Sequence, residues 1–278
     1  MATIKKRCIA LVNRLKFNIT RPEMRVLPGQ LSFFFFLTLI PLVALVGSCI
    51  SLLELPYNSI NDLLDGYFPK GTAFFLNIIS NNMEFSFNWI IFFASSLFLA
   101  SNATDSMIIA SNQIYKIEDK PYIKRRAKAF FMMIILFVLL LFVLLIPVFG
   151  DMIFKLIGSI NDVSGFRKFV VSVYHTLKYP LSFLFIFGMI KLIYIMAPDK
   201  KIKRSQVNYG SLFTAISWTL VNQFYSIYIE KFTNYTTFYG SVASLLILLL
   251  WLYLLSYIFV LGMALNVTKY ELDEKKNK

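Results

Sequence analysis

Six long stretches of predominantly apolar residues dominate this chain. The most continuous is 129–151, in which Leu, Ile, Phe, Val and Met follow one another with almost no polar interruption. About 20 apolar residues in helical form cross a hydrocarbon core that is about 30 Å thick. The stretches therefore predict an all-α, polytopic membrane protein with six transmembrane helices. The predicted spans are 31–53, 88–110, 129–151, 174–197, 210–230 and 241–268.

The composition excludes most other classes of protein. Hydrophobic residues make up 58% of the chain and charged residues 15%, against about 45–50% and about 25% in a typical soluble domain. A water-exposed globule of this size would have to place many of these apolar side chains on its surface. Soluble enzymes, disordered proteins and disulfide scaffolds are thus disfavoured. Cys8 and Cys49 lie in a basic arm and in a span, so no disulfide is expected between them.

The positive charges indicate the orientation in the membrane. The formal net charge is +13, and most Lys and Arg residues fall in 5–25, 116–128, 200–204 and 269–278. These segments are alternate connections, and cytoplasmic loops carry an excess of Lys and Arg. Both termini are therefore predicted to be cytoplasmic. We interpret the positive charge as a surface that attracts anionic lipid headgroups, not as a nucleic-acid binding site. The predicted divisions are a basic cytoplasmic arm (1–30), a transmembrane domain (31–268) and a cytoplasmic tail (269–278).

Two further segments are predicted to lie near the membrane surface. Ile4, Cys8, Leu11 and Leu15 recur at helical spacing within the basic arm. This pattern is typical of an interfacial helix on anionic lipid, although an ordinary cytoplasmic arm explains it equally well. The apolar segment 72–79 is too short to span, which predicts a re-entrant or interfacial helix after the first span.

The patterns of catalysis are absent from the sequence. His175 is the single histidine and has no His or Cys partner at metal-ligand spacing. The chain has neither a Walker A sequence nor a Gly-x-Ser-x-Gly elbow. Its carboxylates are scattered, whereas a two-metal nuclease needs a cluster of them. We therefore expect no enzyme activity, no cofactor and no metal.

Two charges are predicted to lie at membrane depth, where charged side chains usually mark functional sites. Asp105 and Lys191 each lie well inside a span that descends from the outer face, so their depths should match. This predicts an Asp105–Lys191 ion pair or a shared hydrated pocket. Alternatively, each side chain reaches the inner headgroups by itself, as Lys191 can do by snorkelling.

The fifth span is the most polar, and three spans contain proline. Gln223, Ser226 and Glu230 recur at spacings of three and four with Asn222 alongside, which places them on one helix face. Such side chains either hold helices together by hydrogen bonds or line a path for a polar substrate. Proline frees backbone carbonyl groups and bends helices. The predicted bends are at Pro41, Pro147 and Pro180.

Two segments resemble signatures of the YihY/virulence factor BrkB family. Residues 27–42 (LPGQLSFFFFLTLIPL) resemble its first span, with Pro41 in the Leu-x-Pro-Leu element. Around the last span, the chain resembles the family's Tyr-Gly-Ser-x-Ala, Leu-Trp-Leu-Tyr and Gly-Ala-Glu-Leu-Asn elements. The matching residues are Tyr239, Gly240, Ser241, Trp251, Tyr253, Gly262 and Asn266. Ala197-Pro198-Asp199 and residues 218–228 also fit the family.

The resemblance implies a bacterial inner-membrane protein with six spans and no settled activity. Members were once labelled ribonuclease BN, which is now regarded as a misassignment, and lipid transport has been suggested for the family. This chain departs from the pattern at Phe33 and Phe34, where tyrosines are usual, and at Ala264, where glutamate is common. A mechanism that needs that acid in the last span is therefore in doubt here.

Two functions are compatible with these patterns. The first is a transporter or flippase-like protein for a lipid or amphiphile, which rests on the proline-containing spans, the polar fifth span and the Asp105–Lys191 site. It would have no ATPase of its own, since no such motif is present. The alternative is a structural or partner-binding membrane protein. No pattern indicates a protein partner or an oligomeric state.

Overall fold

The computed structural model describes residues 16–52, 87–158, 183–231 and 235–274, together with Asn13 and Pro180, and for part of these only the backbone. All regular structure in these ranges is helical, which confirms the predicted all-α class. The predicted segment 72–79, most of the arm helix and His175 lie outside the described residues. The helices are α2 (Glu23–Leu52), α5 (Phe87–Tyr115), α6 (Tyr122–Gly158), α8 (Asn208–Lys231) and α9 (Tyr235–Glu274), with a shorter helix at Phe183–Met196.

The helix ends follow local sequence signals. Pro121 directly precedes α6, a position where its missing N–H costs no helical hydrogen bond. Helix α5 ends with Lys116 in the left-handed region, at a φ of 56°. The Lys116 and Ile117 N–H groups then donate to the carbonyls of Gln113 and Asn112, at 3.2 and 2.8 Å. This is the Schellman arrangement that closes many helices.

Proline does not interrupt α2, which continues through Pro28 and Pro41 as one helix. Pro41 is buried, whereas Pro180 is exposed. Pro147 lies within α6, which also runs on without a break. Both helices therefore continue through their prolines, and the bends expected at Pro41, Pro147 and Pro180 stay predictions.

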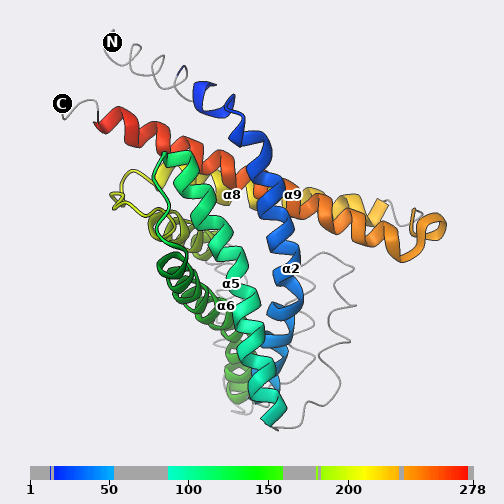
Figure 1. The fold of residues 1–278 in the computed structure, drawn as a ribbon. Coiled ribbons are helices and arrows are strands. Elements are labelled where there is room, and N and C mark those ends of the chain that lie inside the picture. The colour runs from blue at the N-terminus through cyan, green and yellow to red at the C-terminus, as the bar shows by residue number, and fades with distance from the viewer. Residues whose placement is uncertain are drawn as a thin grey trace.

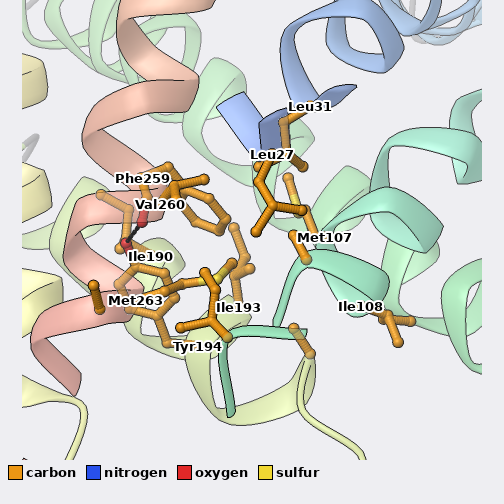
Figure 2. Packing of buried hydrophobic residues seen from close by; sticks show 14 of the residues in the cluster. Leu27, Leu31, Met107, Ile108, Ile190, Ile193, Tyr194, Phe259, Val260 and Met263 are labelled. Carbon is orange, nitrogen blue, oxygen red and sulfur yellow. Dashed lines mark hydrogen bonds between the residues drawn. The ribbon is translucent and has the colours of Figure 1, made fainter. Parts of the chain in front are cut away.

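One hydrophobic core joins all the described helices near one end of the molecule. Leu27 and Leu31 from α2 pack with residues of α5, Phe183–Met196 and α9, as Figure 2 shows. This is the end where α2, α6 and α8 begin and where α5, Phe183–Met196 and α9 end, and we call it the joint end. It also contains the loop 197–207, which follows Phe183–Met196 and precedes α8.

The helices form two groups that diverge from the joint end (Figure 1). The first group contains α5 and α6, with α2 beside α5, and the second contains α8 and α9. The two groups extend away from the joint end at an angle to each other. Helix α2 also contacts α9 where the two cross. Among the described residues, one helical segment is long and apolar enough to cross a membrane. It is Leu245–Glu274, with a mean hydropathy of 2.5.

Candidate functional site

Asp105 has a different partner from the one predicted. The Arg125 Nε donates to the Asp105 Oδ1 at 3.0 Å, and both side chains are largely buried. Lys191 instead lies over the ring of Phe187, with its Nζ 5.7 Å from the centroid. Among the described side chains, Asp105 and Lys191 form no ion pair, so that form of the prediction is corrected.

The antiparallel α5–α6 hairpin explains the exchange of partners. It brings the first turn of α6 beside the last turns of α5, where Asp105 lies. Arg125 also reaches Asp119 in the connection, with its Nη1 3.7 Å from Oδ2. In the sequence Arg125 counted as one loop cation among several. An arginine four residues after Pro121 was the available signal, because Pro121 fixes where α6 begins.

The polar residues of the predicted fifth span separate into two environments. The Asn222 Oδ1 accepts a hydrogen bond from Trp251 Nε1 at 3.0 Å, which joins α8 to α9. Gln223 is exposed on the surface of α8. Packing therefore uses Asn222, whereas the Gln223 amide stays available. The side chains of Ser226 and Glu230 lie outside what the structure describes.

A buried carboxylate cluster joins the α5–α6 hairpin to the loop 197–207. The Asp199 side chain is 2% exposed, and its Oδ1 lies 2.8 Å from Lys128 Nζ and 3.3 Å from Lys120 Nζ. Asn112 Nδ2 donates to the Asp199 Oδ2 at 2.8 Å, and the Asp199 N–H donates to Asn112 Oδ1 at 2.9 Å. We call Asn112, Lys120, Lys128 and Asp199 the carboxylate cluster.

The charges of this cluster satisfy one another. Lys128 Nζ also donates to the carbonyls of Ala197 and Pro198, at 2.7 and 3.0 Å. Burial alone would raise the pKa of Asp199, but the hydrogen bonds from Lys128 and Asn112 and the Lys128 charge lower it to about 2. Burial lowers the pKa of Lys128, and Asp199 partly offsets that shift. Asp199 is therefore ionised near neutral pH and holds the loop to α5 and α6.

A second contact, made by small residues, joins α8 to α9. A Cβ atom on Gly262 would collide with Thr214 Oγ1 and Tyr194 OH and would lie 3.0 Å from the Gly210 carbonyl oxygen. A Cβ on Gly210 would collide with the Gly262 carbonyl oxygen and with Asn266. Only glycine allows the two backbones this approach. We call Tyr194, Gly210, Thr214, Gly262 and Asn266 the glycine contact.

Hydrogen bonds complete the glycine contact. The Tyr194 hydroxyl donates to the Phe259 carbonyl at 2.7 Å, the bond drawn in Figure 2, and lies 2.8 Å from Thr214 Oγ1. Asn266 Oδ1 accepts from the Gly210 N–H at 2.8 Å. That N–H belongs to the first turn of α8, where a helix has no internal acceptor. Asn266 thus caps α8 from α9, and Tyr194 fixes Phe183–Met196 to both helices.

The family-motif residues occupy distinct positions. Gly262 and Asn266 belong to the glycine contact, and Trp251 makes the hydrogen bond to Asn222. Tyr253 is exposed on α9. The structure describes only the backbone of Tyr239, Gly240 and Ser241, which lie in the first turns of α9.

The end of the N-terminal arm also packs against the joint end. Asn18 is buried and donates from Nδ2 to Thr268 Oγ1 at 2.9 Å and to Glu271 Oε2 at 3.3 Å. Arg21 Nη1 donates to the Ile114 carbonyl at 3.3 Å. The arm thereby connects the last turns of α5 and α9. Among the described residues, no three His, Cys, Asp or Glu side chains are grouped closely enough to hold a metal ion.

The helical fold and the apolar helix long enough to cross a membrane are consistent with a helical membrane protein. The family model described as virulence factor BrkB matches residues 18–278. The chain belongs to the virulence factor BrkB family, as its motifs indicated.

Bacterial relatives support the same assignment. The chain is 27% identical to the putative ribonuclease-like protein YfkH of Bacillus subtilis over 93% of this chain and 94% of that protein. It is 26% identical to a UPF0761 membrane protein of Janthinobacterium over 91% of this chain and 59% of the relative. A UPF0761 membrane protein of Haemophilus influenzae is 36% identical over 34% of this chain and 35% of the relative's own length. No solved structure matches.

Proposed function

We propose that this chain is a six-span protein of the bacterial inner membrane, with cytoplasmic termini, that moves a lipid or amphiphile between leaflets. In this proposal it needs no ATPase of its own. The observation that carries it is the arrangement of two helix groups that are bonded together at the joint end and diverge from it. In this proposal the joint end holds the two groups together, and the substrate passes along the exposed surface of α8 that carries Gln223.

Two features support the cytoplasmic placement of the joint end. The four basic segments that the sequence assigns to the cytoplasm all begin or end there. Two of their cations bond to neighbouring elements there: Arg21 donates to the Ile114 carbonyl, and Lys128 donates to Asp199. The positive-inside rule places such a cluster of basic connections at the cytoplasmic face.

Gln223 is the side chain that we assign to the substrate path. It is exposed beside Leu220 and Phe224, which are also exposed apolar residues of α8. Polar side chains in membrane helices usually face a bundle interior or water, because an unpaired amide is costly in lipid. A path for polar headgroups would provide partners for this amide.

A scrambling assay tests the proposal. Purified protein is reconstituted into vesicles that contain fluorescent phosphatidylglycerol, phosphatidylethanolamine or phosphatidylcholine, and a membrane-impermeant quencher reports lipid that reaches the outer leaflet. We expect faster exchange than in protein-free vesicles. Gln223→Leu should slow it several-fold, whereas Phe224→Leu, on the same surface, should not. No acceleration for any lipid, with or without an ion gradient, contradicts the proposal.

A packing role is the second candidate, and the Asn222–Trp251 hydrogen bond favours it. In that case the polar residues of α8 serve to hold helices together, and the protein is a structural or partner-binding component of the membrane. Absence of lipid exchange in a well-folded preparation would favour this role. Labelling of single cysteines at Lys203 and Asp162 in spheroplasts tests the orientation independently, since only the second should react with an impermeant maleimide.

A further inference from the structure

The loop 197–207 contains both buried and exposed side chains. Ile202 and Val207 pack into the core at 6% and 0% exposure. Lys201, directly before Ile202, and Lys203 and Arg204, directly after it, are exposed. The two apolar residues therefore anchor the loop from within, and the three cations face outward from a fixed support.

Hydrogen bonds hold the backbone of this loop in place. The Lys203 N–H donates to Gln206 Oε1 at 3.1 Å, and the Gln206 N–H donates to the Lys203 carbonyl at 2.9 Å. Gln206 Nε2 donates in turn to Asp273 Oδ2 of α9 at 3.3 Å. A loop that is ordered before binding loses less conformational entropy when a ligand arrives.

The nearby carboxylates are already paired with other cations. Asp199 pairs with Lys128 at 2.8 Å, Asp273 with Lys269 at 3.5 Å and Glu274 with Lys200 at 3.7 Å. No described side chain forms an ion pair with Lys201, Lys203 or Arg204. The loop thus presents three neighbouring positive charges without internal neutralisation.

An exposed aromatic residue borders the same loop. Tyr209, in the first turn of α8, is 65% exposed. Lys269 of α9 lies over its ring, with Nζ 5.9 Å from the centroid. Tyrosine and basic side chains together are typical of the level of lipid headgroups, where an amphipathic ring and phosphate groups meet.

We propose that Lys201, Lys203, Arg204 and Tyr209 form a binding site for the phosphate group of an anionic phospholipid. The site rests on the proposed cytoplasmic position of the joint end, because that leaflet supplies the anionic lipid. The fixed loop would hold the guanidinium and ammonium groups around the phosphate, and the Tyr209 ring would lie against the glycerol and acyl boundary. Basic loops attract anionic lipid in general, and the proposal names one defined site at which a lipid binds.

The test measures lipid binding without any translocation. The full chain is purified in a zwitterionic detergent and titrated with phosphatidylglycerol, phosphatidylcholine or inorganic phosphate, while native mass spectrometry counts bound lipid and thermal unfolding reports stabilisation. We expect phosphatidylglycerol alone to bind and to raise the melting temperature. The triple variant Lys201→Gln/Lys203→Gln/Arg204→Gln should bind it at least tenfold more weakly, since each cation near a membrane contributes about fivefold.

A matched variant separates a local site from general charge. Arg25→Gln/Lys116→Gln/Lys124→Gln removes three other exposed cations of the joint end and should bind phosphatidylglycerol within about twofold of the wild type. Lys203→Gln and Tyr209→Ala provide single variants if the triple variant unfolds. Equal losses in both triple variants, or equal stabilisation by inorganic phosphate, overturn the site. If the protein shows no scrambling activity but the variant at Lys201, Lys203 and Arg204 still loses phosphatidylglycerol binding selectively, the binding site stands and only the proposed transport function is contradicted.

Discussion

The carboxylate cluster and the glycine contact join helices in opposite ways. The first uses a nearly buried ion pair, in which Asp199 holds the α5–α6 hairpin through Lys128 and Asn112. The second uses no charge, and α8 and α9 approach closely because Gly210 and Gly262 have no side chains. The comparison shows that an ion pair fixes a loop to its neighbouring helices, whereas small-residue packing joins two helices that lie side by side.

Removing Lys128 should have the largest effect on stability. Lys128→Ala leaves the Asp199 carboxylate buried with Lys120 as its remaining cation, and breaking a buried pair costs about 3–5 kcal/mol. Because Lys120 remains at 3.3 Å, we expect about 2–4 kcal/mol. Thermal unfolding in detergent measures this. Lys120→Ala removes a half-exposed cation and should cost about 0–1 kcal/mol, so an equal loss from both variants would contradict a buried pair.

Adding one methyl group tests the glycine contact. Gly262→Ala places a Cβ against Thr214, Tyr194 and the Gly210 carbonyl, and overpacking of this kind costs about 1–3 kcal/mol. A lower melting temperature is expected. Gly188→Ala is the control, because a Cβ there meets no atom within 4 Å. If both variants melt alike, the close approach of α8 and α9 does not limit stability.

Acid should weaken the carboxylate cluster and leave the glycine contact unchanged. The pKa of Asp199 falls from its ordinary 3.8 to about 2 in the folded protein. Its contribution, about 2 kcal/mol, is therefore complete above pH 3.8 and is lost as the pH falls toward 2. Melting temperatures between about pH 5 and about pH 2 should fall more steeply for the wild type than for Asp199→Asn. Parallel curves would show that Asp199 does not titrate in this range.

A double-mutant cycle sharpens the assignment of Asp105. Asp105→Asn combined with Arg125→Gln should reveal a coupling of about 1 kcal/mol, because the two side chains form a largely buried hydrogen-bonded pair. The same cycle with Lys191→Gln should give a coupling near zero. A larger coupling to Lys191 than to Arg125 would restore the pair expected from depth alone.

The smallest effect is expected between α8 and α9 beyond the glycine contact. Asn222→Ala removes the acceptor for Trp251, and hydrogen bonds between membrane helices contribute about 0.6 kcal/mol on average. Gln223→Ala should leave the melting temperature unchanged, because that side chain is exposed. Equal destabilisation by both would place Gln223 in a packing contact as well.

Much of the helical framework was predictable from the sequence. The described helices lie where the apolar stretches are, since long apolar runs have few alternatives to a helix. Gly262 and Asn266 were singled out by motif, and the structure places both in the glycine contact. Their function there depends on Gly210, which is distant in sequence and carries no periodic signal.

The ion pairs were not predictable in the same way. Depth along a helix suggested that Asp105 and Lys191 could meet, but depth does not specify which helices are neighbours. The short connection between α5 and α6 specifies that these two helices are neighbours. It therefore brings Arg125 to Asp105 independently of how the other helices pack. The carboxylate cluster was missed for a related reason: Asn112, Lys128 and Asp199 belong to separate segments that meet only after the core has formed.

The Tyr194 hydroxyl has consequences for the order in which the protein assembles. Its partners, Thr214 and the Phe259 carbonyl, follow it by 20 and 65 residues. At synthesis rates of about 5–20 residues per second, Phe259 leaves the ribosome about 3–13 s after Tyr194. During this interval the Tyr194 hydroxyl has Thr214 as its one native partner and lacks the Phe259 carbonyl. The final position of the helix Phe183–Met196 is therefore set late, when α9 arrives, so nascent chains that end before α9 should expose Tyr194 to chaperones and proteases.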